Sequence, residues 1–194
     1  MVACVVGVVG AKLYYLTGHW LRGRRPNPLT AGMCIQGFVL GAIATLVVGA
    51  WAAGVPVGAV VDVTAPGLLF GMTVGRFGCF FGGCCAGRPT ASRWGLWSSD
   101  RRLGMRRIPT QLLESAVALL VGLAALLAVW ATTPQPAGVV FIGAIAAYTL
   151  GRQLLFPLRA GRRHTAHGRT LAMAFAGLAV AAAIAVATFA ASSG

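Results

Sequence analysis

The sequence predicts an all-α fold, a polytopic membrane helix bundle with about six transmembrane helices. Its 194 residues are 58% hydrophobic and only 10% charged, whereas soluble domains are about 25% charged. Apolar stretches close to the roughly 20 residues that cross a bilayer recur along the chain. Lipid cannot hydrogen-bond exposed backbone groups, so each stretch should form a helix. Residues 1–194 should together make up one transmembrane domain.

Six apolar segments account for the expected helices. The N-terminus shows neither the basic region nor the cleavage site of a removed signal peptide, so none is expected. The third segment is interrupted by Asp62, Pro66 and Arg76, and the last is rich in alanine. Glycine and alanine throughout the segments allow close packing of helices. In order, the segments are Val2–Leu16, Ala31–Ala53, Val57–Phe81, Ile108–Ala131, Ala137–Leu158 and Thr170–Ala191.

Among the loops, only alternate ones hold basic residues. The loops after the first, third and fifth segments hold thirteen arginines, and the other two loops hold none. By the positive-inside rule, the arginine-rich loops are cytoplasmic and both termini lie outside. A net charge of +13 would suggest a nucleic acid as the partner of a soluble protein. Here the arginines border membrane spans, so the expected partner is anionic lipid and not nucleic acid.

The stretch from Gly71 to Thr90 holds the strongest functional candidates. It places Arg76 inside an apolar segment, where an ionisable residue is a functional-site candidate by default. Cys79 follows on the same helix face, and a nearby arginine stabilises the reactive thiolate. A glycine pair should then end the helix and bring backbone close to a ligand, and Cys84 and Cys85 follow that break. The alternative is a tight turn with buried, inert thiols.

Polar residues in other segments add weaker candidates. Tyr148 and Arg152 lie four residues apart and share a helix face, although Arg152 is close enough to the segment end to reach the membrane interface instead. Asp62 and Glu114 are the only acids in or near the segments. Each should meet an arginine, because an unpaired charge there is costly. Gln36, in the second segment, should either hydrogen-bond another helix or serve the site.

Six short stretches match, in order, the motifs of one protein family. They are Gly10–Tyr15, Gly32–Gly37, Asp62–Pro66, Gly75–Thr90, Pro109–Glu114 and Tyr148–Arg152. On these stretches the chain resembles bacterial prolipoprotein diacylglyceryl transferase, whose members move a diacylglyceryl group from phosphatidylglycerol to the thiol of a lipobox cysteine. The resemblance implies a multi-pass transferase of the bacterial cell (inner) membrane. Its partners would be phosphatidylglycerol and a thiol-bearing protein or peptide, and no cofactor is expected.

Two groups of site residues follow from the resemblance. Catalytic roles fall to Arg76, Arg152, Cys79, Cys84 and Gln36, and substrate binding to Tyr148, Arg88, Gly83, Gly87 and Glu114. The two catalytic arginines would hold the lipid phosphate and stabilise the glycerol phosphate as it leaves. Five positions depart from the family: Gln36 and Ile108 each replace a histidine, Cys79 an asparagine, Cys84 a glutamate and Leu113 a tyrosine. Because Gln36 cannot take a proton from a thiol, either Cys79 acts as a covalent relay or the acceptor thiol loses its proton to water.

The resemblance and the charge pattern imply opposite membrane orientations. In the family, the signature faces the extracytoplasmic side and both termini lie inside. We expect that orientation, because lipobox substrates are modified outside. Neither the family's first span nor its larger extracytoplasmic head is expected to have a counterpart in this sequence.

Two alternatives from other functional classes remain open. The first is a membrane thiol protein in which Cys79, Cys84 and Cys85 form a redox pair or bind a soft metal. Their Cys-x4-Cys-Cys spacing is not a standard zinc spacing, so no metal is expected. The second is a lipid-binding relative that lacks transferase activity.

Overall fold

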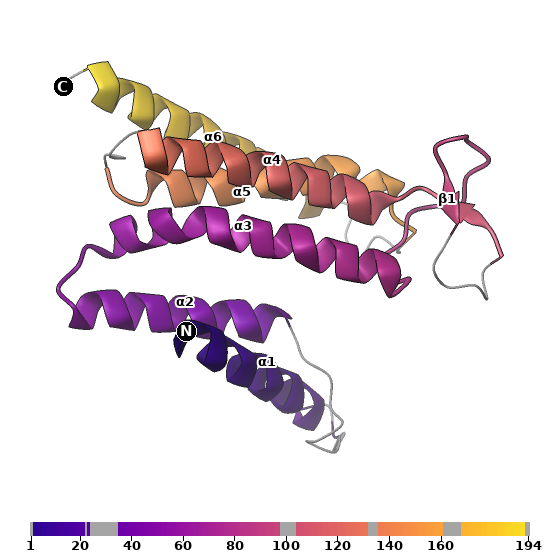
Figure 1. Ribbon diagram of the computed structural model, residues 1–194, viewed down its shortest axis with the longest axis horizontal. Helices are drawn as coiled ribbons and strands as arrows, with labels where there is room; N and C mark the ends of the chain where they lie inside the picture. Colours follow the sequence, from indigo (N-terminus) through magenta and orange to yellow (C-terminus); the bar gives the residue numbers. More distant parts are fainter. Residues whose placement is uncertain are drawn as a thin grey trace. The chain divides into compact units, whose positions relative to one another are not determined.

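The computed structural model is almost entirely helical (Figure 1). It describes residues 2–21, 23, 35–97, 104–131, 136–160 and 168–192. In this part of the chain the all-α prediction is confirmed. The helices are α1 (Val2–Trp20), α2 (Ile35–Ala52), α3 (Val57–Phe81), α4 (Thr110–Ala131), α5 (Val139–Leu155), the 3-10 helix η2 (Phe156–Leu158) and α6 (Gly168–Ser192), and the strands are β1 (Leu96–Trp97) and β2 (Arg106–Arg107).

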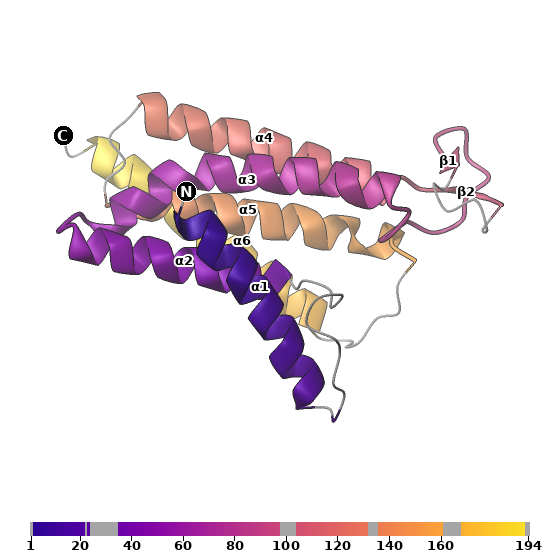
Figure 2. The ribbon, with the colours of Figure 1, turned by 60° about the horizontal axis from the view of Figure 1, so that its bottom comes forward.

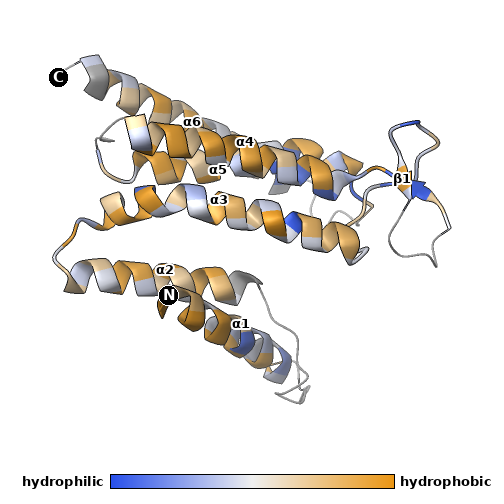
Figure 3. Cartoon of the chain, viewed as in Figure 1, coloured by the Kyte–Doolittle hydropathy of each residue, from blue (hydrophilic) through white to orange (hydrophobic). Residues whose placement is uncertain are grey.

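Most of the helices have the length and composition of membrane spans. Among the described residues, α1, α3, α4, α5 with η2, and α6 are long and apolar enough to cross a membrane. The remaining predicted span, α2, has a shorter apolar stretch at Gly37–Ala52. Figure 3 shows apolar residues along the helices and strongly polar residues around β1. The chain is therefore a multi-pass membrane protein, with its backbone polar groups satisfied inside helices.

Helix boundaries differ from the predicted ones where prolines intervene. α4 begins at Thr110, two residues later than predicted, because Pro109 fixes the backbone just before the helix. Pro157 lacks an N–H group, and the end of α5 tightens there into η2. α1, in contrast, continues to Trp20 instead of ending at Leu16, since no proline lies between them and the single Gly18 is tolerated inside the helix.

The chain divides into two compact units, Met1–Val60 and Val61–Gly194. In the first unit, α1 and α2 pack with their backbones in contact. A Cβ atom at Gly10 or at Gly37 would overlap the carbonyl oxygen of the other residue. Only glycine at both positions permits this approach, which is a common way for membrane helices to pack. The prediction of a single domain stays a prediction.

The second unit contains the candidate site. Figures 1 and 2 show α3, α4 and α5 running alongside one another, with the β1–β2 pair beyond one end of α3 and α4. The Ser115 hydroxyl donates to the Thr73 carbonyl oxygen at 3.0 Å and joins α4 to α3. Gly122 lets α4 approach α3 closely, because a Cβ there would press on Leu69. The buried core consists of Leu69, Ala118, Ala125, Ala144 and Tyr148.

Asp62 stabilises the end of this unit that lies away from the strands. Its carboxylate oxygens accept hydrogen bonds from the backbone N–H groups of Gly138 at 2.6 Å and Phe141 at 2.7 Å. These groups belong to the first turn of α5, where N–H groups lack partners within the helix and favour negative charge. The predicted arginine partner of Asp62 is wrong among the described residues, because the helix N-terminus supplies the compensating charge.

Candidate functional site

A glycine turn ends α3 and starts the loop of the candidate site. Gly82 donates its backbone N–H to the Gly78 carbonyl oxygen at 2.9 Å, and Gly83 follows with a φ of 70°. A left-handed glycine is the usual way to stop a helix. The prediction that the glycine pair ends the helix is therefore confirmed. Cys85 also adopts a left-handed backbone, with a φ of 59°, which is uncommon for a residue with a side chain.

The first turn of α4 holds this loop in place. The Gln111 side-chain amide donates to the Cys84 carbonyl oxygen at 2.8 Å, and the Thr110 hydroxyl donates to the Cys85 carbonyl oxygen at 3.2 Å. Gly87 continues the loop and is buried. A Cβ atom at Gly87 would overlap the Ile108 carbonyl oxygen, so glycine is required for this close approach of two backbones.

The loop also pairs with the end of η2. The Arg88 backbone N–H donates to the Leu158 carbonyl oxygen at 2.8 Å, and the Arg88 carbonyl oxygen accepts from Ile108 at 3.0 Å. Strands β1 and β2 pair antiparallel beside it, with Leu96 opposite Arg107. The end of α3, the start of α4 and the end of α5 are thereby tied together by backbone hydrogen bonds.

Glu114 lies at the centre of a buried ion-pair cluster below this loop. Its side chain is 2% exposed, and its Oε2 atom lies 2.9 Å from Nε of Arg76. Its Oε1 atom accepts a hydrogen bond from Nη1 of Arg159 at 3.2 Å. Nη2 of Arg76 donates to the Tyr148 hydroxyl at 3.5 Å. Two guanidinium groups and one carboxylate leave the cluster with one excess positive charge, which attracts an anionic group.

Part of this cluster is predictable from the sequence. The predicted arginine partner of Glu114 is confirmed, and Arg76 is that partner. Arg159 was missed as a site residue and counted only among the loop arginines. One signal could have found it: Arg159 follows Pro157 at the end of the fifth segment, and Glu114 lies one turn into the fourth, so both are near the same membrane interface.

The other predicted polar residues have different surroundings. Arg152 is half-buried on α5 and makes no ion pair with a described residue, while Tyr148, one turn earlier, is buried against Arg76. Arg88 contributes backbone hydrogen bonds and is exposed. Gln36 lies near the start of α2, in the other unit, and its side chain lies outside the described residues. Cys34 also lies outside them.

The three signature thiols gather at the end of α3. The sulfur atoms of Cys79, Cys84 and Cys85 all lie within 4.8 Å of one another, and all three are free thiols. The Cys84 thiol donates to the Cys79 carbonyl oxygen at 3.7 Å. Removal from water, followed by hydrogen bonding with Cys79, raises the pKa of Cys84 to about 11. The guanidinium group of Arg76, the arginine expected beside Cys79, contacts Glu114 and Tyr148.

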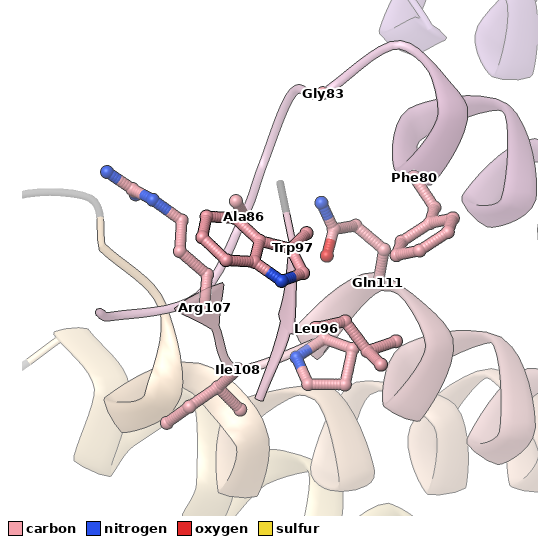
Figure 4. A pocket seen from close by; sticks show the side chains of 9 residues that line it. Phe80, Gly83, Ala86, Leu96, Trp97, Arg107, Ile108 and Gln111 are labelled. Atoms are coloured by element: carbon pink, nitrogen blue, oxygen red, sulfur yellow. The ribbon is translucent and has the colours of Figure 1, made fainter. Parts of the chain in front are cut away.

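Two hollows adjoin the loop. The smaller, shown in Figure 4, lies between the strands and the loop and has a volume of about 10 Å³, room for about one water molecule. Arg107 borders it and donates from Nη1 to the Gly87 carbonyl oxygen at 3.3 Å, while its Nε atom is buried and has no hydrogen-bond partner among the described residues. The larger hollow has a volume of about 430 Å³. It is lined by Thr90, Ser92, Trp94, Gly95, Ile108, Pro109 and Leu113.

The chain is similar to several known proteins. A relative from Streptomyces coelicolor, named phosphatidylglycerol–prolipoprotein diacylglyceryl transferase 2, is 35% identical over 181 residues, which are 85% of this chain and 56% of the relative. A relative from Synechococcus elongatus, named phosphatidylglycerol–prolipoprotein diacylglyceryl transferase, is 32% identical over 80% of this chain and 59% of its own length. One of the same name from Chloroflexus aggregans is 37% identical over 50% of this chain and 33% of its own length.

The extent of these matches identifies the family. The chain spans between a third and three fifths of the length of these relatives. A model of the family described as prolipoprotein diacylglyceryl transferase matches residues 1–193, which is nearly the whole chain. The chain therefore belongs to the prolipoprotein diacylglyceryl transferase family.

Proposed function

We propose that this protein transfers a diacylglyceryl group from phosphatidylglycerol to a cysteine thiol of a protein or peptide. The observation that carries the proposal is the cluster in which Glu114 holds Arg76 and Arg159 beneath the signature loop. Family membership supports the same conclusion, since the relatives' names contain both substrates. The multi-pass helices suit a lipid substrate, and we assign the protein to the bacterial cell membrane.

The ion-pair cluster is the proposed binding site of the lipid phosphate. Oε2 of Glu114 forms an ion pair with Nε of Arg76, and the Tyr148 hydroxyl accepts a hydrogen bond from Nη2, while Nη1 makes no hydrogen bond to a described residue. A guanidinium group presents its donors in a rigid fork that matches phosphate oxygens. Arg152, which lacks an ion-pair partner among the described residues, supplies a second guanidinium to the same anion. Arg88 adds positive charge at the solvent-exposed edge of this proposed phosphate site.

The reaction forms one bond and breaks one bond. The acceptor thiolate attacks the glyceryl carbon that bears the phosphate ester oxygen, and a carbon–sulfur bond forms. The carbon–oxygen bond breaks, and its electron pair leaves with glycerol phosphate. The thiol proton passes to water. Fixed guanidinium groups stabilise the negative charge that develops on the leaving phosphate, and this preorganised charge is a large catalytic effect.

A covalent relay through Cys79 does not suit this chemistry. Attack of Cys79 on the lipid would produce a thioether, and a thioether sulfur is a poor leaving group for the second step. The thiols therefore need another role. A thiol-redox function is a second candidate, because the three sulfur atoms lie within 4.8 Å of one another. Titration of free thiols in the purified protein before and after reduction distinguishes it from transfer.

The test is direct detection of transfer. Purified protein is incubated with a cysteine-containing lipobox peptide in vesicles that contain phosphatidylglycerol or, as the control, only phosphatidylethanolamine. Mass spectrometry should find the diacylglyceryl mass on the peptide with phosphatidylglycerol alone. Arg76→Ala should lower the rate by about 10²- to 10³-fold, whereas Arg93→Ala, at an exposed loop arginine, should not. Equal rates for the two variants would refute the phosphate role of Arg76, and lipid binding without transfer would identify a non-catalytic relative.

A further inference from the structure

We propose that Cys79, Cys84 and Cys85 form a binding site for one thiophilic metal ion of the Zn²⁺ class, with an open fourth position. Nothing in the charged cluster or in the proposed phosphate binding requires these three thiols. They differ from it in chemistry, since they are soft sulfur ligands and the cluster consists of hard nitrogen and oxygen groups. The glycine turn of the loop brings the three thiols together, because it folds Cys84 and Cys85 back toward α3.

The distances between the sulfur atoms suit a metal. A zinc–sulfur bond is about 2.3 Å long, so two sulfurs bound tetrahedrally lie roughly 3.8 Å apart. All three sulfur atoms already lie within 4.8 Å of one another. Each therefore has to approach its neighbours by about 1 Å at most, a shift that small rotations of the cysteine side chains supply. Three thiols gathered this closely form a nearly assembled ligand set.

The backbone that carries the thiols is fixed by contacts outside the cluster. Cys79 belongs to the last turn of α3. The carbonyl oxygens of Cys84 and Cys85 accept hydrogen bonds from Gln111 and Thr110 of α4. Because the loop backbone is already fixed, binding of an ion costs it little conformational entropy, and this preorganisation raises the affinity of the site.

Charge and access also fit a cation. The side chains of Cys84 and Cys85 are exposed and Cys79 is half-buried, so an ion reaches the sulfurs from the loop side. Three thiolates around Zn²⁺ carry a net charge of −1, and Arg76, one helical turn before Cys79, helps to balance it. Binding of the cation displaces the thiol protons to water, because cysteine binds a metal as the thiolate.

Three protein ligands leave one tetrahedral position open, which is typical of catalytic rather than structural zinc sites. The use of this position rests on the proposed transferase function. An acceptor cysteine that binds there loses its proton to water as its metal–sulfur bond forms, because a thiol coordinated to zinc is deprotonated. No oxidant or reductant is needed. This role would supply the thiolate in a chain where Gln36 stands in place of the family's histidine.

The metal site is tested first by binding alone. Full-length protein in detergent, reduced and freed of metal with a chelator, is titrated with Co²⁺ as a spectroscopic probe and then with Zn²⁺. One ion per chain should bind, with thiolate-to-cobalt absorption bands that Zn²⁺ abolishes. Cys79→Ser, Cys84→Ser and Cys85→Ser should each weaken binding by more than about 100-fold. Cys4→Ser, at an exposed thiol of α1, is the matched control and should bind normally.

Several outcomes would overturn the proposal. They are absence of the absorption bands in a protein that keeps its helical circular dichroism, unchanged affinity in the three loop variants, or recovery of a disulfide between two of these cysteines under mild reduction. The open position is tested separately, by peptide transfer with and without Zn²⁺. Transfer that persists without metal and is lost in Arg76→Ala would refute the role of the ion while leaving the transferase function intact. Metal binding without any transfer would refute the transferase function and leave the metal site intact.

Discussion

The carboxylate of Glu114 on α4 holds the guanidinium of Arg76 on α3, with 2.9 Å between Oε2 and Nε. Both side chains lie largely out of water, with exposed fractions of 2% and 15%. This ion pair holds the permanently charged guanidinium group of Arg76 near the ends of α3 and α4. It prevents the Arg76 side chain from turning toward the membrane interface. The same carboxylate binds Arg159, so one acid on α4 joins two cations, one on α3 and one just after η2.

Glu114→Gln should destabilise the protein by about 3–5 kcal/mol, because it leaves two largely buried guanidinium groups without their counter-charge. Thermal unfolding in detergent, followed by tryptophan fluorescence, measures the effect. Leu113→Ala is the control, since this neighbouring side chain is 38% exposed, and it should cost less than about 1.5 kcal/mol. Equal destabilisation by the two variants would contradict the assignment of Glu114 as the organising acid.

Arg76→Lys should not restore transfer that Arg76→Ala has lost. Lysine keeps the charge but cannot contact Glu114, Tyr148 and a phosphate oxygen at once through a planar fork. The rate of peptide modification should fall by about 10²-fold or more in both variants, with stability better preserved in the lysine variant. Full activity in Arg76→Lys would show that charge alone suffices at this position.

Gly87→Ala should destabilise the loop by about 1–3 kcal/mol, because the added Cβ overlaps the Ile108 carbonyl oxygen. Gly71→Ala is the matched control: a Cβ there meets no atom of a described residue within 4 Å, and alanine in a helix is more favourable than glycine by up to about 1 kcal/mol. Thermal unfolding and limited proteolysis of the loop should therefore show that Gly87→Ala is less stable than the original protein and Gly71→Ala more stable.

Cys84 should react slowly with alkylating reagents until the solution is strongly alkaline. Its pKa is raised from 9.0 to about 11, and only the thiolate reacts. In metal-free protein, the alkylation rate of Cys84, followed by mass spectrometry, should keep rising between about pH 9 and pH 11. The neutral thiol is the form that the fold favours, so the contribution of Cys84 to stability is present below pH 9 and is lost through this window.

A variant tests the cause of this pKa shift. Cys79→Ser removes the neighbouring thiol that contributes to the raised pKa of Cys84. The alkylation profile of Cys84 in this variant should move to lower pH. Cys4→Ser, at an exposed thiol in the other unit, serves as the control and should leave the profile unchanged. An unchanged profile in Cys79→Ser would exclude Cys79 as a cause of the shift.

The membrane orientation is open to a reporter experiment. A reporter fused after Asn27 should be active on the extracytoplasmic side, and one fused after Val55 in the cytoplasm, if acceptors are modified outside. The thirteen loop arginines favour the reverse orientation by the positive-inside rule. A cytoplasmic Asn27 would exclude extracytoplasmic lipobox proteins as acceptors.

The fold was largely predictable from the sequence, and the site only in part. Hydropathy alone predicts the helices, because a bilayer permits few other structures for an apolar chain. Arg76 and Glu114 were recognisable, since charged residues in apolar segments must find partners. Arg159 was not recognised, because it lies among other loop arginines and only its position just after Pro157, at the end of the fifth segment, sets it apart. Asp62 was assigned the wrong partner, since a helix N-terminus offers positive charge that composition does not reveal.

The left-handed backbone of Cys85 has a further consequence for anyone who mutates the loop. At a φ of 59° a side chain costs of order 1 kcal/mol relative to glycine. Cys85→Gly therefore removes a sulfur and relaxes the chain in one step, whereas Cys85→Ser removes the sulfur and retains the strain. Comparing the two variants separates what the thiol contributes from what the twisted backbone costs. A more thermostable glycine variant that has lost metal binding would mark position 85 as a site where stability and function oppose each other.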